Sequence, residues 1–303
     1  MRRYAVALLA LGVLGLAGFW LLTQPATTAA TDLPEHTADA AAGAMVFAAG
    51  GCVSCHAAPG AREEAKLILA GGLELKTPFG TFVVPNISPD PEHGIGGWSQ
   101  AEFVTAMMQG TSPDGAHYYP AFPYTSYARM EVADVMDLQA YIATLQPSQN
   151  VAPAHDLGFP FNISRGLGLW KRLYLSAEPV LPVPEDPILA RGQALVEGAG
   201  HCAECHTPRD FAGGMQTARW MAGGPNPDGP GRIPNITPHE SGIGGWAESD
   251  ITYYLETGFT PEFDSAGGQM ASVILNMAQL PPEDRAAIAA YLKSLPPLPS
   301  DAP

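Results

Sequence analysis

Residues 52–56 read Cys-Val-Ser-Cys-His, and residues 202–206 read Cys-Ala-Glu-Cys-His. In this spacing, two thiols one helical turn apart can each bond a vinyl group of haem, and the histidine that follows faces the iron. Disulfide bonds or zinc could also occupy the four cysteines of the chain, but neither explains a histidine after both pairs. The motifs therefore predict two covalent haems, with thioether bonds at Cys52, Cys55, Cys202 and Cys205 and iron ligands at His56 and His206.

The chain repeats itself around these motifs. Pro-Asn-Ile-Ser-Pro at residues 85–89 returns as Pro-Asn-Ile-Thr-Pro at 234–238, and Gly-Ile-Gly-Gly-Trp at 94–98 returns at 242–246. Order and spacing are kept at an offset near 149 residues. We therefore predict two copies of one domain. The expected organisation is a membrane anchor or signal segment at 1–30, domain 1 at 38–147, an interdomain linker at 148–186 and domain 2 at 187–297.

Each copy is expected to be helical. A short apolar helix precedes each cysteine motif, at 40–49 and 187–198, a second helix begins near Ser99 or Glu248, and a last helix follows Glu131 or Pro282. No run alternates convincingly with a period of two, so sheet content should be low. The 33 glycines and 30 prolines indicate long loops. A haem could stabilise these loops by supplying an apolar centre against which they pack. The predicted fold class is all-α, with a few helices around a covalent haem in each domain.

The N-terminus resembles an export or anchor segment. Arg2 and Arg3 precede an uncharged apolar run at residues 4–22. This run is longer than the core of an ordinary cleaved signal peptide and close to the length that spans a bilayer. We expect an uncleaved anchor, with a cleaved signal peptide as the alternative. The two arginines keep that end cytoplasmic, so the rest of the chain should lie on the periplasmic side of the bacterial inner membrane.

Charge restricts the possible partners. The net charge is −15, so nucleic acid is not expected to bind, and a basic protein surface is the more natural partner. Three of the fifteen basic residues nevertheless fall within residues 165–175 of the linker. Two interpretations stay open for this segment: a docking or membrane-surface helix, or a strap whose Trp170 and Leu173 pack between the domains.

The sixth iron ligands are expected to be methionines. Met130 lies just before the last helix of domain 1, and Met270 lies in the corresponding loop of domain 2, where Met277 is the alternative. His117 is a rival in domain 1, although a histidine at the haem edge or the surface is the better interpretation. Methionine at both irons would leave little room for substrate, which favours electron transfer over an enzyme. A di-haem peroxidase-like enzyme is the alternative function.

Several of these motifs together resemble a known family. The run at 119–124, the repeated Asn-Ile and Gly-Trp motifs and the run at 200–209 are similar to those of the cytochrome c subunits of membrane-bound bacterial alcohol, gluconate and fructose dehydrogenases. The resemblance covers about residues 40–295 and implies two tandem class I cytochrome c domains, with Met130 and Met270 where the axial methionines of that family are expected.

The resemblance also implies partners. The donor would be a periplasmic dehydrogenase, and the acceptor would be quinone, a terminal oxidase or another cytochrome, with the membrane reached through the N-terminal helix. The familiar members of that family carry three haems, whereas this sequence has two motifs, so the donor could be a different periplasmic oxidoreductase.

Overall fold

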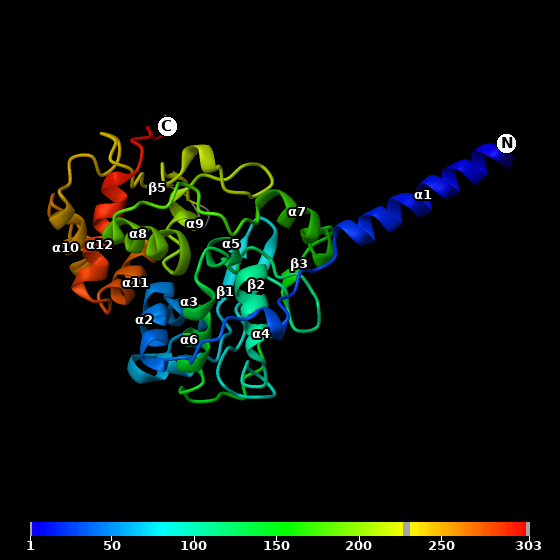
Figure 1. Ribbon diagram of the computed structural model, residues 1–303, viewed down its shortest axis with the longest axis horizontal. Helices are drawn as coiled ribbons and strands as arrows, with labels where there is room; N and C mark the ends of the chain where they lie inside the picture. The colour runs from blue at the N-terminus through cyan, green and yellow to red at the C-terminus, as the bar shows by residue number, and fades with distance from the viewer. Residues whose placement is uncertain (1, 227–230, 301–303) are drawn as a thin grey trace.

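The computed structural model describes residues 2–226 and 231–300 and shows a mainly helical body from which one long helix projects (Figure 1). That helix, α1 (Arg2–Leu22), has no buried residues. Within the described residues it is the one helix long and apolar enough to cross a membrane. Its length and composition fit either a membrane anchor or a signal segment.

The first copy follows a short turn, η1 (Ala30–Asp32), and contains the helices that the sequence predicts, together with short elements that it does not. Its elements in chain order are α2 (Ala40–Gly50), α3 (Cys52–His56), η2 (Glu63–Ile68), β1 (Glu74–Thr77), β2 (Gly80–Val83), α4 (Gln100–Val104), η3 (Thr105–Gln109), α5 (Tyr124–Tyr127) and α6 (Val132–Ile142). The linker adds β3 (Asp156–Leu157), η4 (Ser164–Gly166) and α7 (Leu167–Tyr174).

The second copy keeps the same order of helices. Its elements are α8 (Pro187–Gln193), η5 (Ala194–Ala199), α9 (Ala203–His206), η6 (Thr217–Arg219), β4 (Gly224–Pro225), β5 (Arg232–Ile233), α10 (Glu248–Thr257), α11 (Gly268–Met277) and α12 (Pro282–Ser294). The expected helix at 187–198 is therefore divided between α8 and the wider turn η5, and α11 is longer than the short segment that the sequence suggested.

Local sequence explains where these helices begin. The Asp39 carboxylate accepts from the Ala41 amide at 2.7 Å at the start of α2. Asp186 caps α8 in the same way, with Pro187 in the first turn. Ser99 and Glu102 form a reciprocal capping box at the start of α4. These caps satisfy amide groups that have no partner within the helix.

In each copy the first and last helices cross at close range. α2 packs against α6, and α8 packs against α12. A β-carbon added at Gly43 would overlap the Asp137 carbonyl, and one added at Gly192 would overlap the Ala287 carbonyl. The two glycines occupy equivalent positions in the repeat, so this close approach of backbones is built into both copies.

Strands are few, as predicted, but a small sheet was missed. β1, β2 and β3 form a three-stranded antiparallel sheet in which Leu75 pairs with Phe82 and Thr81 pairs with Asp156. Gly80, the first residue of β2, has a φ of 128°, a conformation that favours glycine. The strands are too short for alternation to reveal them in the sequence.

The linker is a strap across the body, which supports one of its two interpretations. The Trp170 indole donates to the Ala212 carbonyl at 2.9 Å, and the Tyr174 hydroxyl donates to Asp210 at 2.8 Å, so α7 contacts the second copy. Lys171 is buried and donates to the Gln109 and Gly110 carbonyls of the first. The expectation that Leu173 packs between the copies is wrong, because its side chain is 76% exposed.

Candidate functional site

Each cysteine motif forms one helical turn at the junction between an apolar helix and a long loop. Gly51 ends α2 in the left-handed conformation and begins α3. The first cysteine of each motif, Cys52 or Cys202, is partly buried, whereas Cys55 and Cys205 are exposed. Burial raises the pKa of both Cys52 and Cys202 to about 12, so these thiols are protonated before they react.

The histidines are oriented by backbone carbonyls. His56 Nδ1 lies 2.9 Å from the Pro85 carbonyl oxygen, and His206 Nδ1 lies 2.8 Å from the Pro234 carbonyl oxygen. A carbonyl can only accept, so Nδ1 carries the proton and Nε2 keeps its lone pair for a metal. Burial lowers the pKa of both histidines, that of His56 to about 4. The repeated Pro-Asn motif therefore supplies the acceptor for both imidazoles.

The residue after each proline fixes that carbonyl in place. The Asn86 side chain accepts from the Ser88 amide and donates to the Ser148 carbonyl, beyond the last helix of its copy. In the second copy, Asn235 makes the same bonds to the Thr237 amide and the Leu298 carbonyl. The asparagine of the motif thus connects the histidine loop to the chain that leaves the final helix.

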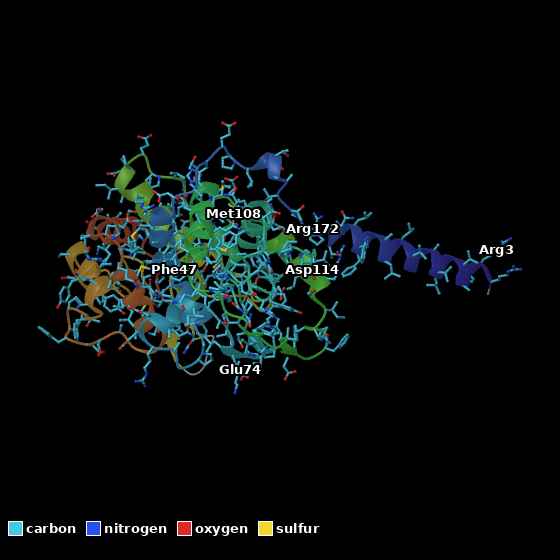
Figure 2. The ribbon with its side chains drawn as sticks, turned by 90° about the horizontal axis from the view of Figure 1, so that it is seen from below. Arg3, Phe47, Glu74, Met108, Asp114 and Arg172 are labelled. Carbon is cyan, nitrogen blue, oxygen red and sulfur yellow. The ribbon has the colours of Figure 1, made fainter. Side chains whose placement is uncertain are left out.

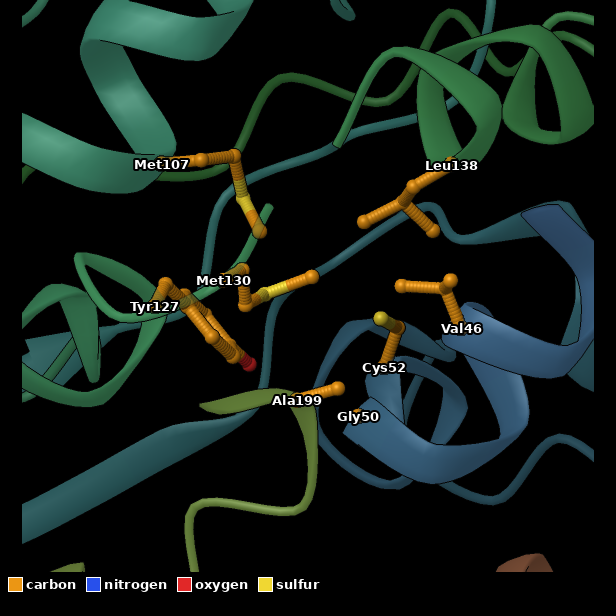
Figure 3. A pocket seen from close by; sticks show the side chains of 8 residues that line it. All are labelled: Val46, Gly50, Cys52, Met107, Tyr127, Met130, Leu138 and Ala199. Atoms are coloured by element: carbon orange, nitrogen blue, oxygen red, sulfur yellow. The ribbon is translucent and has the colours of Figure 1, made fainter. Parts of the chain in front are cut away.

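An apolar cavity lies beside the first cysteine motif. Figure 3 shows the Met130 and Met107 side chains entering it from one side, with Cys52 on another. Its lining residues are Val46, Gly50, Cys52, Met107, Tyr127, Met130, Leu138 and Ala199. A largely apolar lining that includes the first cysteine of the motif suits the face of a haem. The predicted ligand Met130 is 8% exposed and lies in this cavity.

The two candidate ligands of the second copy, Met270 and Met277, lie on one helix, α11, so the expectation that Met270 lies in a loop is wrong. Met277, at the end of α11, is 4% exposed and belongs to the buried cluster, against which the half-buried Met270 packs. At an offset of 150 residues, Met277 aligns with Tyr127 and Met270 aligns with Pro120, so neither shares a column with Met130. The choice of Met270 over Met277 stays a prediction.

His117 has a structural role away from the haem motifs. It is buried, and its Nε2 donates to the Thr23 carbonyl at 2.9 Å, just after the end of α1. Burial lowers the pKa of its imidazole. The interpretation of His117 as a surface histidine is therefore wrong, and its bond to Thr23 weighs against the rival assignment as an iron ligand.

Each haem motif contacts the other copy. The Ser54 hydroxyl accepts from the Asn276 amide at 2.8 Å, and Glu204 accepts from the Ser126 hydroxyl at 2.8 Å. Ser54 and Glu204 occupy the same position in their motifs, and Ser126 and Asn276 are likewise 150 residues apart. The two bonds are thus related by an approximate two-fold axis, as in a symmetric dimer.

Whole elements obey the same symmetry. α5 of the first copy packs against η5 of the second, and the equivalent end of α11 packs against α2. Across the axis, the His201 ring nitrogen lies 3.1 Å from the Gly50 carbonyl oxygen. This arrangement brings the segments that carry Cys52 and Cys202 side by side.

Sequence reasoning missed the charged residues that hold this interface. Thr125 also donates to Glu204, which pairs with Arg209. Arg129 is buried against Glu197, donates to the Glu178 carbonyl and stacks over the Trp220 ring. Most of these partners lie far apart in the chain, so the sequence does not show that they meet. The one signal for this role is that Glu204 lies within, and Arg209 beside, a motif of the repeat.

Comparison with known proteins agrees with the repeat. The chain matches the Cytochrome c family twice, over residues 40–146 and 189–296. It is 54% identical to a "Diheme cytochrome c-type" protein of Cereibacter sphaeroides, over 98% of this chain and 99% of that protein.

Two further relatives are parts of dehydrogenases. The chain is 40% identical to one of the subunits of nicotinate dehydrogenase from Pseudomonas putida, over 84% of this chain but 21% of that protein. It is 36% identical to the fructose dehydrogenase cytochrome subunit of Gluconobacter japonicus, over 94% of this chain and 58% of that protein. The resemblance found in the sequence motifs is thereby confirmed. The chain belongs to the cytochrome c family and consists of two cytochrome c domains that carry two covalently bound haem c groups.

Proposed function

We propose that this chain transfers electrons on the periplasmic side of the bacterial inner membrane, from a dehydrogenase to the respiratory chain. The acceptor would be quinone, a terminal oxidase or another cytochrome. The observation that carries the proposal is that each haem motif contacts the other copy across a symmetric interface, Ser54 through Asn276 and Glu204 through Ser126. Such an arrangement suits a carrier that receives an electron in one domain and releases it from the other.

The proposal includes an assignment of residues to the haems. Thioether bonds form at Cys52, Cys55, Cys202 and Cys205, and His56 and His206 bind iron through Nε2 because Nδ1 is held by a proline carbonyl. Met130 and Met270 would supply the sixth ligands. Bound haem supplies a reversible one-electron couple, while the protein orients the ligands and excludes water from the Met130 cavity.

The dehydrogenase partner rests on the relatives. The chain resembles proteins named as parts of fructose and nicotinate dehydrogenases, and its acidic surface suits a basic docking site. It spans about half the length of the fructose dehydrogenase relative and about a fifth of the nicotinate dehydrogenase relative, but nearly all of the Cereibacter protein. We place it at the membrane through α1, whose 21 residues rise about 30 Å, the thickness of the hydrocarbon core.

Optical spectroscopy of the holoprotein tests this function. The oxidised form should show the far-red methionine-to-iron band from both haems and should bind neither carbon monoxide when reduced nor peroxide when oxidised. Met270→Ala should remove half of that band, whereas Met277→Ala should keep it and lower stability. A haem that binds peroxide and turns it over would favour a peroxidase-like enzyme instead.

A further inference from the structure

Exposed apolar side chains collect in the linker, close to where α1 leaves the body. Phe159 is 82% exposed, Ile163 is 52% exposed and Leu173 is 76% exposed, and Phe161 and Leu169 are also exposed. All five side chains lie within residues 159–173. We call this segment, with its five exposed apolar side chains, the linker face. Exposed apolar groups that collect in one part of a surface mark sites where a protein contacts a membrane or another protein.

The linker face is held firmly at the end of α1. Arg172 Nε donates to the Leu22 carbonyl at 2.6 Å, and Arg165 donates to the Trp20 carbonyl and the Thr23 hydroxyl, each at 2.9 Å. The Arg165 guanidinium also lies 4.1 Å from the centre of the Trp20 ring. Figure 2 shows Arg172 at the junction between α1 and the body. The basic groups of the segment therefore cap the last carbonyls of α1, where helix dipoles favour positive charge.

α7 has distinct inner and outer sides. Gly168 and Lys171 are buried against the body, and Trp170 donates to the Ala212 carbonyl. Leu169 and Leu173 are four residues apart and therefore lie on one side of the helix, and both are exposed. The strap thus binds the two copies with one side and leaves an apolar side uncovered.

The length of α1 determines how deep the exposed apolar side of α7 would lie in a membrane. If α1 spans the bilayer, Leu22, its last residue, lies at the edge of the hydrocarbon core. A group that bonds the Leu22 carbonyl must lie at that same level. Arg172 does so, and Leu173 is its neighbour in the chain.

We propose that the linker face is a membrane-docking surface that seats the body on the bilayer that α1 crosses. The inference rests on the proposed anchoring by α1 and adds an orientation to it. The lipid bilayer is the occupant that the structure supports, because the exposed groups continue the apolar surface of α1 past its end. Apolar insertion must provide the attachment, since a net charge of −15 opposes adsorption to anionic lipid.

Thiol labelling of the full-length holoprotein in vesicles tests the proposal. With the native cysteines bonded to haem, a cysteine introduced by Leu173→Cys or Phe159→Cys is the free thiol of the chain. Ile188→Cys, on α8 of domain 2 and 59% exposed, is the matched control. A water-soluble polyethylene glycol maleimide is added to vesicles of phosphatidylcholine and phosphatidylglycerol, and each rate is divided by that of the same variant in urea.

Docking predicts that the normalised rates at 173 and 159 fall at least about tenfold below that at 188. Flotation of the vesicles separates the two hypotheses. Protein that floats with the vesicles but reacts equally fast at 173 and 188 overturns the docking surface and leaves the anchor intact. Protein that stays behind when the vesicles float overturns the anchor, and the docking surface with it.

Discussion

His56 and His206 show how much of the site is decided by single residues. Each imidazole is held by a proline carbonyl, and each proline is followed by an asparagine that fastens the loop. The cysteines and the histidines could be picked out from the sequence, because their spacing is local and repeated. The interface charges Arg129 and Glu204 could not, since their role depends on partners that the fold brings together from distant parts of the chain.

Substitution of Met130 tests the ligand of the first domain. Met130→Ala should remove the far-red band of one haem and open that iron to carbon monoxide, which optical titration measures. Met107 lines the same cavity, so Met107→Ala is the control. It should leave both bands in place and lower the free energy of unfolding by about 2–5 kcal/mol, as expected for a truncated core side chain. If the band followed Met107 instead, the assignment of Met130 would be wrong.

Among the elements, α7 and the end of α1 form a junction that the sequence pattern did not predict. The helices at 40–50, 132–142 and 282–294 were predictable from apolar periodicity and caps. The sequence also marked 165–175 as unusual because it concentrates basic residues. It could not show that these residues bond backbone carbonyls of α1, because a carbonyl acceptor leaves no trace in the pattern of side chains.

Gly168 should be essential to this junction. A β-carbon there would lie 2.6 Å from Thr23 Cα and 2.9 Å from His117 Nε2. Gly168→Ala should therefore displace the end of α1 and cost about 1–3 kcal/mol, seen as a lower melting temperature and faster proteolysis at residues 24–39. Gly166→Ala is the control, because nothing lies within 4 Å of its added carbon. Equal behaviour of the two variants would contradict the close contact.

His117 should make the same junction sensitive to pH. Burial lowers its pKa in the folded protein below the ordinary value of about 6.5, and Lys171 and Arg165 add unfavourable positive charge nearby. The unfolded chain then binds more protons, so stability should fall as the pH drops below about 6.5. Unfolding in detergent, followed by haem absorbance, should show a smaller loss in His117→Gln. An identical pH profile in both proteins would rule out His117 as the cause.

At the scale of the whole molecule, the two copies carry different residues at an equivalent position of the haem motif. Position 54 carries a neutral serine, whereas position 204 carries a carboxylate enclosed by Thr125, Ser126 and Arg209. The repeat itself, the two domains and the haem count could be read from the sequence. The symmetric packing could not, because its contacts join residues that are distant in the chain, such as Ser54 with Asn276 and Ser126 with Glu204.

Glu204→Gln should change one haem more than the other. Loss of a negative charge within the second motif should raise the potential of that haem by roughly tens of millivolts, because such a charge stabilises the oxidised haem. Ser54→Ala, the same position in the first motif, should leave both potentials nearly unchanged. Spectroelectrochemical titration measures the shift, and unmoved potentials in Glu204→Gln would contradict the role of the carboxylate.

The approximate two-fold axis has a consequence for how such a protein arises. An interface in which Ser54 meets Asn276 while Glu204 meets Ser126 is what a homodimer of single-haem ancestors would possess. A linker that joins the two domains makes their association intramolecular, so it no longer depends on protein concentration. Each domain then meets the other at an effective concentration of roughly millimolar. Gene duplication then frees each half to diverge, so two formerly identical redox centres can acquire different driving forces within one chain.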